Sequence, residues 1–210
     1  MTKKRQLAIL GASGHGKVVG DIALLTGWHE VAFFDDAWSS QSTVGPWSVK
    51  GDSECLLEQC AMYDGIAVAI GDNQTRLEKL RLFEQQGVEL VTLIHPSAVL
   101  SCHACVGKGS VLCAGAVISP FTRVGNGCII NTGATVDHDC IIADGVHVSP
   151  GAHLGGSVRV GTASWIGIGA CVKQNICIGE SSIVGMGAVV IRDVLAGVIV
   201  VGNPAHEIDS

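Results

Sequence analysis

Residues 118–148 read ISPFTRVGNGCIINTGATVDHDCIIADGVHV, and every sixth residue of this stretch, counted from its first, is isoleucine or valine. The same phase continues on both sides without a break. The aliphatic positions are Ile94, Leu100, Val106, Leu112, Ile118, Val124, Ile130, Val136, Ile142, Val148, Leu154, Val160, Ile166, Val172, Ile178, Val184 and Val190. If these residue types fill about a quarter of positions, chance produces the run with odds on the order of 10⁻¹⁰. So regular a repeat indicates coils that stack on one another.

The position four residues after each aliphatic is mostly small, and a glycine often follows the aliphatic directly. The small residues are Ala98, Ala104, Ser110, Ala116, Thr122, Cys128, Ala134, Cys140, Ala152, Ser164, Ala170, Ser182 and Ala188. This pattern favours a short strand followed by a tight corner that the small residue fills. A β-sandwich would instead need strict alternation and turns roughly every 8–12 residues. We therefore predict a parallel β-helix of hexapeptide repeats over Ile94–Leu195.

Composition excludes several classes of function. The net charge of −6 is spread along the chain without a basic run, so no nucleic-acid partner is expected. The basic start Met1–Arg5 precedes an apolar stretch of only Leu7–Leu10, too short for a signal peptide, and no run approaches the roughly 18 apolar residues of a membrane span. Nine cysteines, an odd number, favour free thiols and a cytoplasmic location. Cys102-His103-Ala104-Cys105 lacks a second pair at zinc-finger spacing, so no metal is expected.

Residues 1–93 have a different pattern, in which strands alternate with helices. The expected strands are Leu7–Leu10, Val31–Phe34, 66–70 and Leu90–Ile94, and the expected helices are Lys17–Leu25 and Arg76–Gln86. This order predicts a small Rossmann-like α/β domain with a parallel sheet. The predicted domains are thus 1–93, the α/β domain, and 94–210, the β-helix with a C-terminal tail.

A glycine-rich turn joins the first strand to the first helix. Its sequence, Gly11-Ala12-Ser13-Gly14-His15-Gly16, places backbone N–H groups at a helix N-terminus, which suits phosphate. Asp35 and Asp36 end the second strand, where dinucleotide folds contact a sugar or base. The spacing is G-x-x-G-x-G rather than G-x-G-x-x-G, so a tight turn that merely needs glycine is the alternative interpretation.

His138 is the candidate catalytic residue of the repeat region. It lies two residues after the inward Val136, so its side chain is expected on the surface of the coil. An exposed polar residue without a role is the alternative. As a general base, a histidine can remove the proton that a nucleophile loses during its attack, and the carboxylate of Asp139 can orient the imidazole and raise its basicity.

Five motifs, in order along the chain, resemble one family. They are Gly-Ala-Ser-Gly-His-Gly, Asp-Asp, Ala-Ile-Gly-Asp-Asn, Ile-His-Pro-Ser-Ala and, at 201–205, Val-Gly-Asn-Pro-Ala. The chain resembles the hexapeptide-repeat sugar O- and N-acyltransferases of the bacillosamine and sialic acid type. The resemblance implies a left-handed β-helix, three hexads per coil, and a homotrimer with each site between adjacent subunits. It also implies direct transfer from acetyl-CoA, the co-substrate, to the 4-amino group of UDP-4-amino-4,6-dideoxy-N-acetylglucosamine, giving UDP-N,N'-diacetylbacillosamine.

The resemblance also implies roles for individual residues. His138 would be the base and Asp139 its partner, while the Gly156 N–H would stabilise the oxyanion. The residues that would hold the uridine diphosphate sugar are Ser13, Gly14, His15, Asp35, Asp36 and Gly71, with Asn131 near the amino group. The residues that would line the acetyl-CoA groove are His147, Ile168 and Met186, and Met186 stands where the family usually has glycine. His15 alternatively approaches the sugar of a neighbouring subunit, and Lys173 and Arg192 either meet CoA phosphates or are solvated surface charges.

Three alternatives remain. A zinc carbonic anhydrase of this fold would use histidines such as His138, His147 and His153, but it would leave the N-terminal α/β domain without a purpose. A non-catalytic scaffold or a sugar-nucleotide sensor would show a degraded site. Within the acyltransferases, the acceptor is alternatively a sialic acid hydroxyl or a GDP- or dTDP-linked amino sugar, and the acyl group is alternatively larger than acetyl.

Overall fold

A computed structural model describes residues 4–40 and 42–208, so the first three residues of the basic start lie outside the described residues. The chain divides into two compact units, Met1–Pro96 and Ser97–Ser210. The boundary predicted between residues 93 and 94 falls slightly before this division. Within 4–40 and 42–208, no helix is both long enough and apolar enough to cross a membrane.

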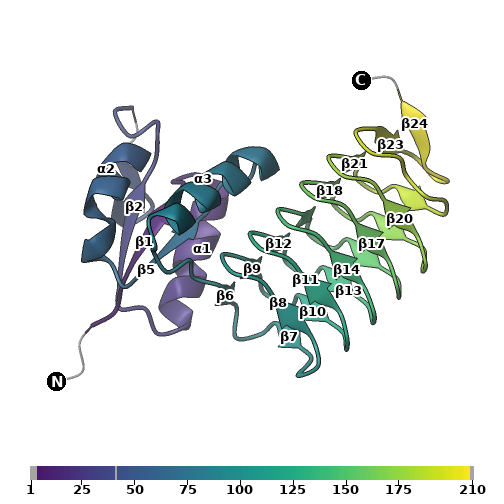
Figure 1. The fold of residues 1–210 in the computed structure, drawn as a ribbon, viewed down its shortest axis with the longest axis horizontal. Coiled ribbons are helices and arrows are strands. Elements are labelled where there is room, and N and C mark those ends of the chain that lie inside the picture. Colours follow the sequence, from purple (N-terminus) through teal and green to yellow (C-terminus); the bar gives the residue numbers. More distant parts are fainter. Residues whose placement is uncertain (1–3, 41, 209–210) are drawn as a thin grey trace. The chain divides into compact units, whose positions relative to one another are not determined.

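The first unit is built on a parallel sheet with the strand order β2-β1-β5 (Figure 1). Its strands are β1 (Gln6–Leu10), β2 (Glu30–Phe34) and β5 (Gly65–Val68). All three are nearly continuous runs of apolar residues, as expected of parallel strands covered on both faces. The predicted α/β class is therefore confirmed. The strand expected at 66–70 ends at Val68.

Helices flank this sheet, and two of them begin earlier than predicted. The helices are α1 (Gly14–Leu25), α2 (Ser53–Gln59), the 3₁₀ turn Cys60–Met62 and α3 (Asn73–Gln85). α1 starts inside the glycine-rich turn rather than at Lys17. α3 starts at Asn73 rather than Arg76 because the Asp72 carboxylate caps it by accepting from the Thr75 N–H at 2.8 Å.

Short elements account for the remaining differences in this unit. A hairpin of β3 (Thr43–Val44) and β4 (Trp47–Ser48), together with α2, was not predicted because these segments are too short to show a period. The strand expected at Leu90–Ile94 is wrong in its first half. Only β6 (Leu93–Ile94) is a strand, and Leu90 forms a single bridge to Ile66.

The second unit is a stack of parallel coils, each made of three two-residue strands (Figure 1). The strands are β7 (Val99–Leu100), β8 (Cys105–Val106), β9 (Val111–Leu112), β10 (Val117–Ile118), β11 (Arg123–Val124), β12 (Ile129–Ile130), β13 (Thr135–Val136), β14 (Ile141–Ile142), β15 (His147–Val148), β16 (His153–Leu154), β17 (Arg159–Val160), β18 (Trp165–Ile166), β19 (Cys171–Val172), β20 (Cys177–Ile178), β21 (Ile183–Val184) and β22 (Val189–Val190). Val99 pairs with Val117, so the repeat between coils is eighteen residues. The predicted parallel β-helix with three hexads per coil is confirmed.

Three sheets form the faces of this helix. The first sheet holds β7, β10, β13, β16, β19 and β22, and the second holds β8, β11, β14, β17 and β20. The third runs from β9 through β12, β15, β18 and β21 to β23 (Ile199–Val201) and β24 (His206–Ile208). β24 pairs antiparallel with β23 and ends the stack. We call the turns between the first and second sheets the first corner, those between the second and third sheets the second corner, and those between the third and first sheets the third corner.

The second residue of each strand points inward, where it is held by stacking. From Leu112 to Val190, every residue of the six-residue series is at most 4% exposed. Burying a Val, Leu or Ile side chain stabilises a fold by about 1.5–3 kcal/mol, so this column is the main source of stability. Glycines after the strands are required by close approach: a Cβ at Gly107 would lie 2.5 Å from the carbonyl carbon of Gly125 in the next coil. The β-helix is thus a rigid support for the side chains on its corners.

Candidate active site

His138 and Asp139 stand together on the first corner, after strand β13. The His138 Nδ1 and the Asp139 Oδ2 are 2.8 Å apart, and about half of each side chain is exposed. Asp139 has a φ of 60°, a left-handed conformation that Asn and Asp tolerate better than most residues. The Asp137 carboxylate accepts from the His138 N–H at 2.8 Å and so fixes the backbone before the pair. Because Nδ1 is engaged, Nε2 is the nitrogen left for proton transfer.

The electrostatic surroundings make this imidazole a stronger base than an isolated histidine. The hydrogen bond that the imidazole donates to Asp139 is the largest cause that raises the pKa of His138, and the charge of Asp137 adds to it. A general base works best when its pKa lies near the operating pH. The pair therefore has the geometry and the charge for general-base chemistry.

Gly156 lies one coil further along the first corner, directly against the imidazole. A Cβ at this position would be 2.6 Å from both Cε1 and Nε2 of His138, so only glycine lets the ring lie there. The Gly156 carbonyl accepts from the Asn175 N–H at 2.9 Å, whereas its own N–H has no acceptor within residues 4–40 and 42–208. A free backbone N–H beside a base is the arrangement required of an oxyanion donor.

Two cations follow on the same corner. Lys173 and Arg192 are exposed, in the turns after β19 and β22 respectively. Coils are spaced by about 4.8 Å, so these residues lie on the order of 5–10 Å beyond Gly156 along the axis. Their position on the C-terminal side of Gly156 is compatible with phosphates of a ligand whose reactive end reaches Gly156.

Asn131 and His147 form a second cluster, at the third corner and on the third sheet. The Asn131 Nδ2 and the His147 Nε2 are 3.1 Å apart, and the Asn131 Oδ1 accepts from the Thr132 N–H at 2.8 Å. That second bond orients the amide so that its NH₂ group donates to His147. The Trp165 ring stacks on His147, with centroids 5.5 Å apart and planes inclined by 7°. The cluster therefore fixes the His147 ring from two sides.

Exposed apolar side chains continue this cluster along the third corner. Ile168 and Met186 occupy equivalent positions in successive turns and are 56% and 79% exposed. They follow strands of the third sheet, which also carries His147. They do not lie with His138, because the width of the first sheet separates the third corner from the first. Residues assigned to one site thus lie at two separate places on one chain.

The predicted nucleotide residues meet around a cavity in the first unit. A cavity of about 220 Å³ is lined by Leu10, Gly11, Ser13, Asp35, Asp36, Ala69, Ile70 and Gly71. It lies at the carboxyl ends of parallel strands, where ligands of α/β folds bind. Gly14 begins α1 beside it. Gly11 is also required by the fold, since its φ is 113° and a Cβ there would be 2.5 Å from the Ala69 carbonyl oxygen.

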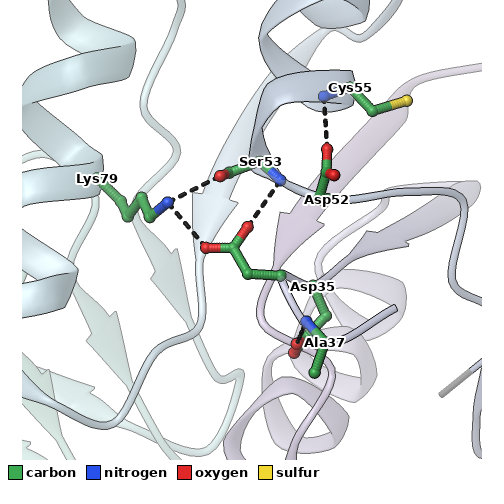
Figure 2. Close-up of polar contacts among 7 residues, drawn as sticks. Asp35, Ala37, Asp52, Ser53, Cys55 and Lys79 are labelled. Carbon is green, nitrogen blue, oxygen red and sulfur yellow. Dashed lines mark hydrogen bonds and ion pairs between the residues drawn. The ribbon is translucent and has the colours of Figure 1, made fainter. Parts of the chain in front are cut away.

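Both acidic residues of this cavity brace the surrounding turns (Figure 2). Asp35 accepts from the Ala12 N–H at 2.7 Å. It also accepts from the Ala37 N–H at 2.9 Å, the bond drawn in Figure 2. Asp36 accepts from the Ser53 N–H at 2.9 Å and forms an ion pair with Lys79 at 2.9 Å, while Lys79 also donates to the Ser53 hydroxyl. These bonds outweigh the cost of burial and lower the pKa of Asp36. Lys79 was not predicted from the sequence, because the position of a lysine in a helix does not indicate an ion pair with a residue 43 positions away.

His15 occupies an unusual environment in the glycine-rich turn. Its Nε2 is buried and has no hydrogen-bond partner within the described residues. Burial, followed by the charge of the buried Arg76, lowers the pKa of His15 to about 4. His15 is therefore a neutral imidazole near pH 7, able to give or accept a hydrogen bond but not to attract a phosphate by charge.

The residues of the zinc alternative do not gather in one chain. His138 lies on the first corner, His147 on the third sheet, and His153 on the first sheet, where it contacts the Thr135 hydroxyl at 2.9 Å. Across 4–40 and 42–208, no group of three or more His, Cys, Asp or Glu side chains is arranged to hold a metal.

Cys140 is buried at its predicted inward position, and burial is the main cause that raises the pKa of its thiol. It is therefore a poor acyl carrier.

Comparison with known proteins connects both units to amino-sugar enzymes. The model of the PglD N-terminal domain matches residues 6–82. The acetyltransferase domain of PglB from Neisseria gonorrhoeae FA1090, solved in complex with acetyl coenzyme A, is 40% identical, with a TM-score of 0.93 over 98% of this chain and 100% of that one. GDP-perosamine N-acetyltransferase from Caulobacter crescentus, solved with CoA and GDP-perosamine, is 36% identical, with a TM-score of 0.93 over 98% and 97% of the two chains.

A curated relative points the same way over a shorter stretch. UDP-N-acetylbacillosamine N-acetyltransferase from Bacillus subtilis (strain 168) is 38% identical over 116 residues. That alignment spans about half of the relative, 52% of its length, and 52% of this chain. The two solved relatives match over nearly their whole length, so the similarity extends to both units.

Proposed function

Because the chain belongs to the family of amino-sugar N-acetyltransferases that includes the PglB acetyltransferase domain and GDP-perosamine N-acetyltransferase, we propose that it transfers an acetyl group from acetyl-CoA to the amino group of a nucleotide-linked sugar. The observation that carries this proposal is the His138–Asp139 pair, placed 2.8 Å apart beside the free N–H of Gly156. A base and an oxyanion donor on neighbouring coils are what aminolysis of a thioester requires.

The proposed reaction is a direct transfer. The sugar amine attacks the thioester carbonyl carbon while Nε2 of His138 takes the proton that the nitrogen loses. The tetrahedral oxyanion accepts a hydrogen bond from Gly156. The intermediate then collapses, the bond from carbon to sulfur breaks, and the departing sulfur takes the proton from His138 to give free CoA and the acetamido sugar. Asp139 holds the imidazole in the tautomer that leaves Nε2 as the acceptor and stabilises its charged form.

We propose UDP-4-amino-4,6-dideoxy-N-acetylglucosamine as the acceptor. The curated UDP-N-acetylbacillosamine N-acetyltransferase supports this choice, as does the cavity that gathers Ser13, Asp35, Asp36 and Gly71 beside the start of α1. Gly14 and His15 are its proposed neighbours in the turn. A GDP-linked amino sugar is the second candidate, because the Caulobacter crescentus enzyme bound to GDP-perosamine matches along nearly the whole chain.

We propose that the active enzyme is a homotrimer with each site shared by two subunits. The first corner carries His138, Gly156 and the cations, whereas Asn131, His147, Ile168 and Met186 lie at the third corner and on the third sheet. One chain presents both halves on separate edges, so the first corner of one subunit facing the third corner of the next would complete the groove.

The nine free cysteines support a reducing compartment, the cytoplasm.

The test follows CoA release with a thiol reagent, using purified protein, acetyl-CoA and either the UDP-linked or the GDP-linked 4-amino sugar. Cys102, Cys105, Cys171 and Cys177 are exposed, so the reagent must reach a plateau before acceptor is added. We expect His138→Ala to lower kcat/KM by about 10²- to 10⁴-fold. An exposed histidine of the terminal strand β24, changed as His206→Ala, is the matched control. Release that is equal in His138→Ala and wild type would remove His138 from the mechanism, and no release with either sugar would reject the proposed acceptors.

A further inference from the structure

Phe121 is an aromatic residue that the fold alone does not explain. It lies on the first corner with a φ of 64°, and 63% of its surface is exposed. The non-glycine residues at positive φ within the described residues are Phe121, Asp139, Ser157, Ala163, Asn175 and Ser181, so Phe121 is the single bulky apolar side chain among them. Its backbone is strained for such a side chain, and its ring is left in water. Both costs would vanish with glycine.

Its position is one coil before the catalytic pair. The Asp139 N–H donates to the carbonyl of Pro120 at 3.1 Å, and the Phe121 N–H donates to the carbonyl of His103, in the coil before it, at 3.2 Å. The Phe121 and His103 rings stack, with centroids 5.5 Å apart and planes inclined by 22°. Phe121 thus lies one coil spacing, about 4.8 Å along the axis, from Asp139, and its ring, backed by His103 in the coil before, forms a platform there.

We infer that Phe121 is a specificity residue that contacts the C6 methyl group of a 6-deoxy amino sugar, an inference that rests on the proposed function. The oxyanion donor Gly156 lies one coil after His138, so the thioester approaches from that side. The acceptor must then reach His138 from the opposite side, where Phe121 lies. In a 4-amino-4,6-dideoxy sugar the methyl carbon is bonded to C5, the neighbour of the reacting C4, so a platform one coil away is within its reach.

The chemistry of the ring favours a methyl over a hydroxymethyl group. A methyl against an aromatic face loses only water contacts, whereas a hydroxyl there loses hydrogen bonds that the ring cannot replace. One such group in an apolar site discriminates by about 10-fold or more. His103 holds the Phe121 ring in place and is a positioning residue for the same contact.

The experiment compares kcat/KM for two acceptors that differ only at C6, UDP-4-amino-4,6-dideoxy-N-acetylglucosamine and its 6-hydroxy counterpart. We expect wild type to prefer the 6-deoxy sugar by about 10-fold, and Phe121→Gly to reduce that preference to about 2-fold or less. Phe121→Gly also relieves the strained φ, so its thermal midpoint should match or exceed that of wild type. Ser181→Gly, at another positive-φ turn on the second corner, is the matched control and should keep the preference.

Each outcome separates the inference from the proposed function. If wild type acetylates neither sugar, the proposed acceptor fails and the inference fails with it. If both sugars are acetylated and the preference is unchanged in Phe121→Gly, the inference alone is overturned. Loss of the oligomer or of thermal stability in Phe121→Gly, with the preference intact, would instead assign Phe121 to a subunit contact and reject its role in specificity.

Discussion

The partly buried imidazole of His15, whose Nε2 is fully enclosed, makes the stability of the protein depend on pH in a predictable direction. In the folded protein its pKa is lowered from 6.5 to about 4, mainly by burial. The unfolded chain therefore binds a proton between these two pH values that the folded protein does not accept. By linkage, the protonation of His15 costs no stability above about pH 6.5. As the pH falls from there toward 4, it lowers the free energy of unfolding progressively.

The size of the loss follows from the two pKa values. The difference is RT times the logarithm of the ratio of the proton-binding polynomials of the unfolded and folded states. It amounts to about 2 kcal/mol at pH 5 and about 3 kcal/mol at pH 4. The window from pH 7.5 to 5 is preferable, because carboxylates with ordinary pKa values near 4 titrate mostly below it.

The assay is urea unfolding of wild type and His15→Asn at pH 7.5 and pH 5, at one protein concentration because oligomer stability depends on it. Wild type should lose about 2 kcal/mol more than the variant over this interval. His138→Asn is the informative control. The pKa of His138 is raised, so protonation there favours the folded state and its removal should make the acid loss steeper. Equal losses in wild type and His15→Asn would refute the assignment of a neutral buried imidazole.

Three further outcomes are expected. Asp139→Asn removes the largest cause of the raised pKa of His138. The acidic limb of the pH profile of kcat/KM should therefore move to lower pH, and the maximum should fall. A limb that does not move would mean that Asp139 does not set the pKa of the base. Heterotrimers assembled from His138→Ala and His147→Ala chains should regain about a quarter of wild-type activity, because random mixing restores that share of intersubunit sites; no recovery would mean that each site lies within one chain. Cys140→Ala should retain transfer without a covalent intermediate, since the thiol is buried, and an inactive but folded variant would contradict direct transfer.

The sequence alone determined the β-helix, because its period is local. Each hexad must place one aliphatic inward and one small residue in a corner, so the positions from Ile94 to Val190 can be read without knowing any long-range contact. The expectations of a left-handed helix and of a trimer came from the family resemblance, since spacing is the same for either hand. The parallel α/β unit followed from alternating patterns, whereas the β3–β4 hairpin and α2 are too short to leave one.

Only the tertiary structure decided which surface residues meet. His138 and Gly156 are one coil apart and lie in contact, while Asn131 and His138, much closer in sequence, stand on different corners. Lys79 reaches Asp36 across 43 residues, and His15 becomes a neutral, buried group through packing that no motif records. The physical reason is that the repeat fixes what points inward, where every coil has the same requirement, and leaves the outward positions free. What those positions do depends on neighbours that only stacking and folding bring near.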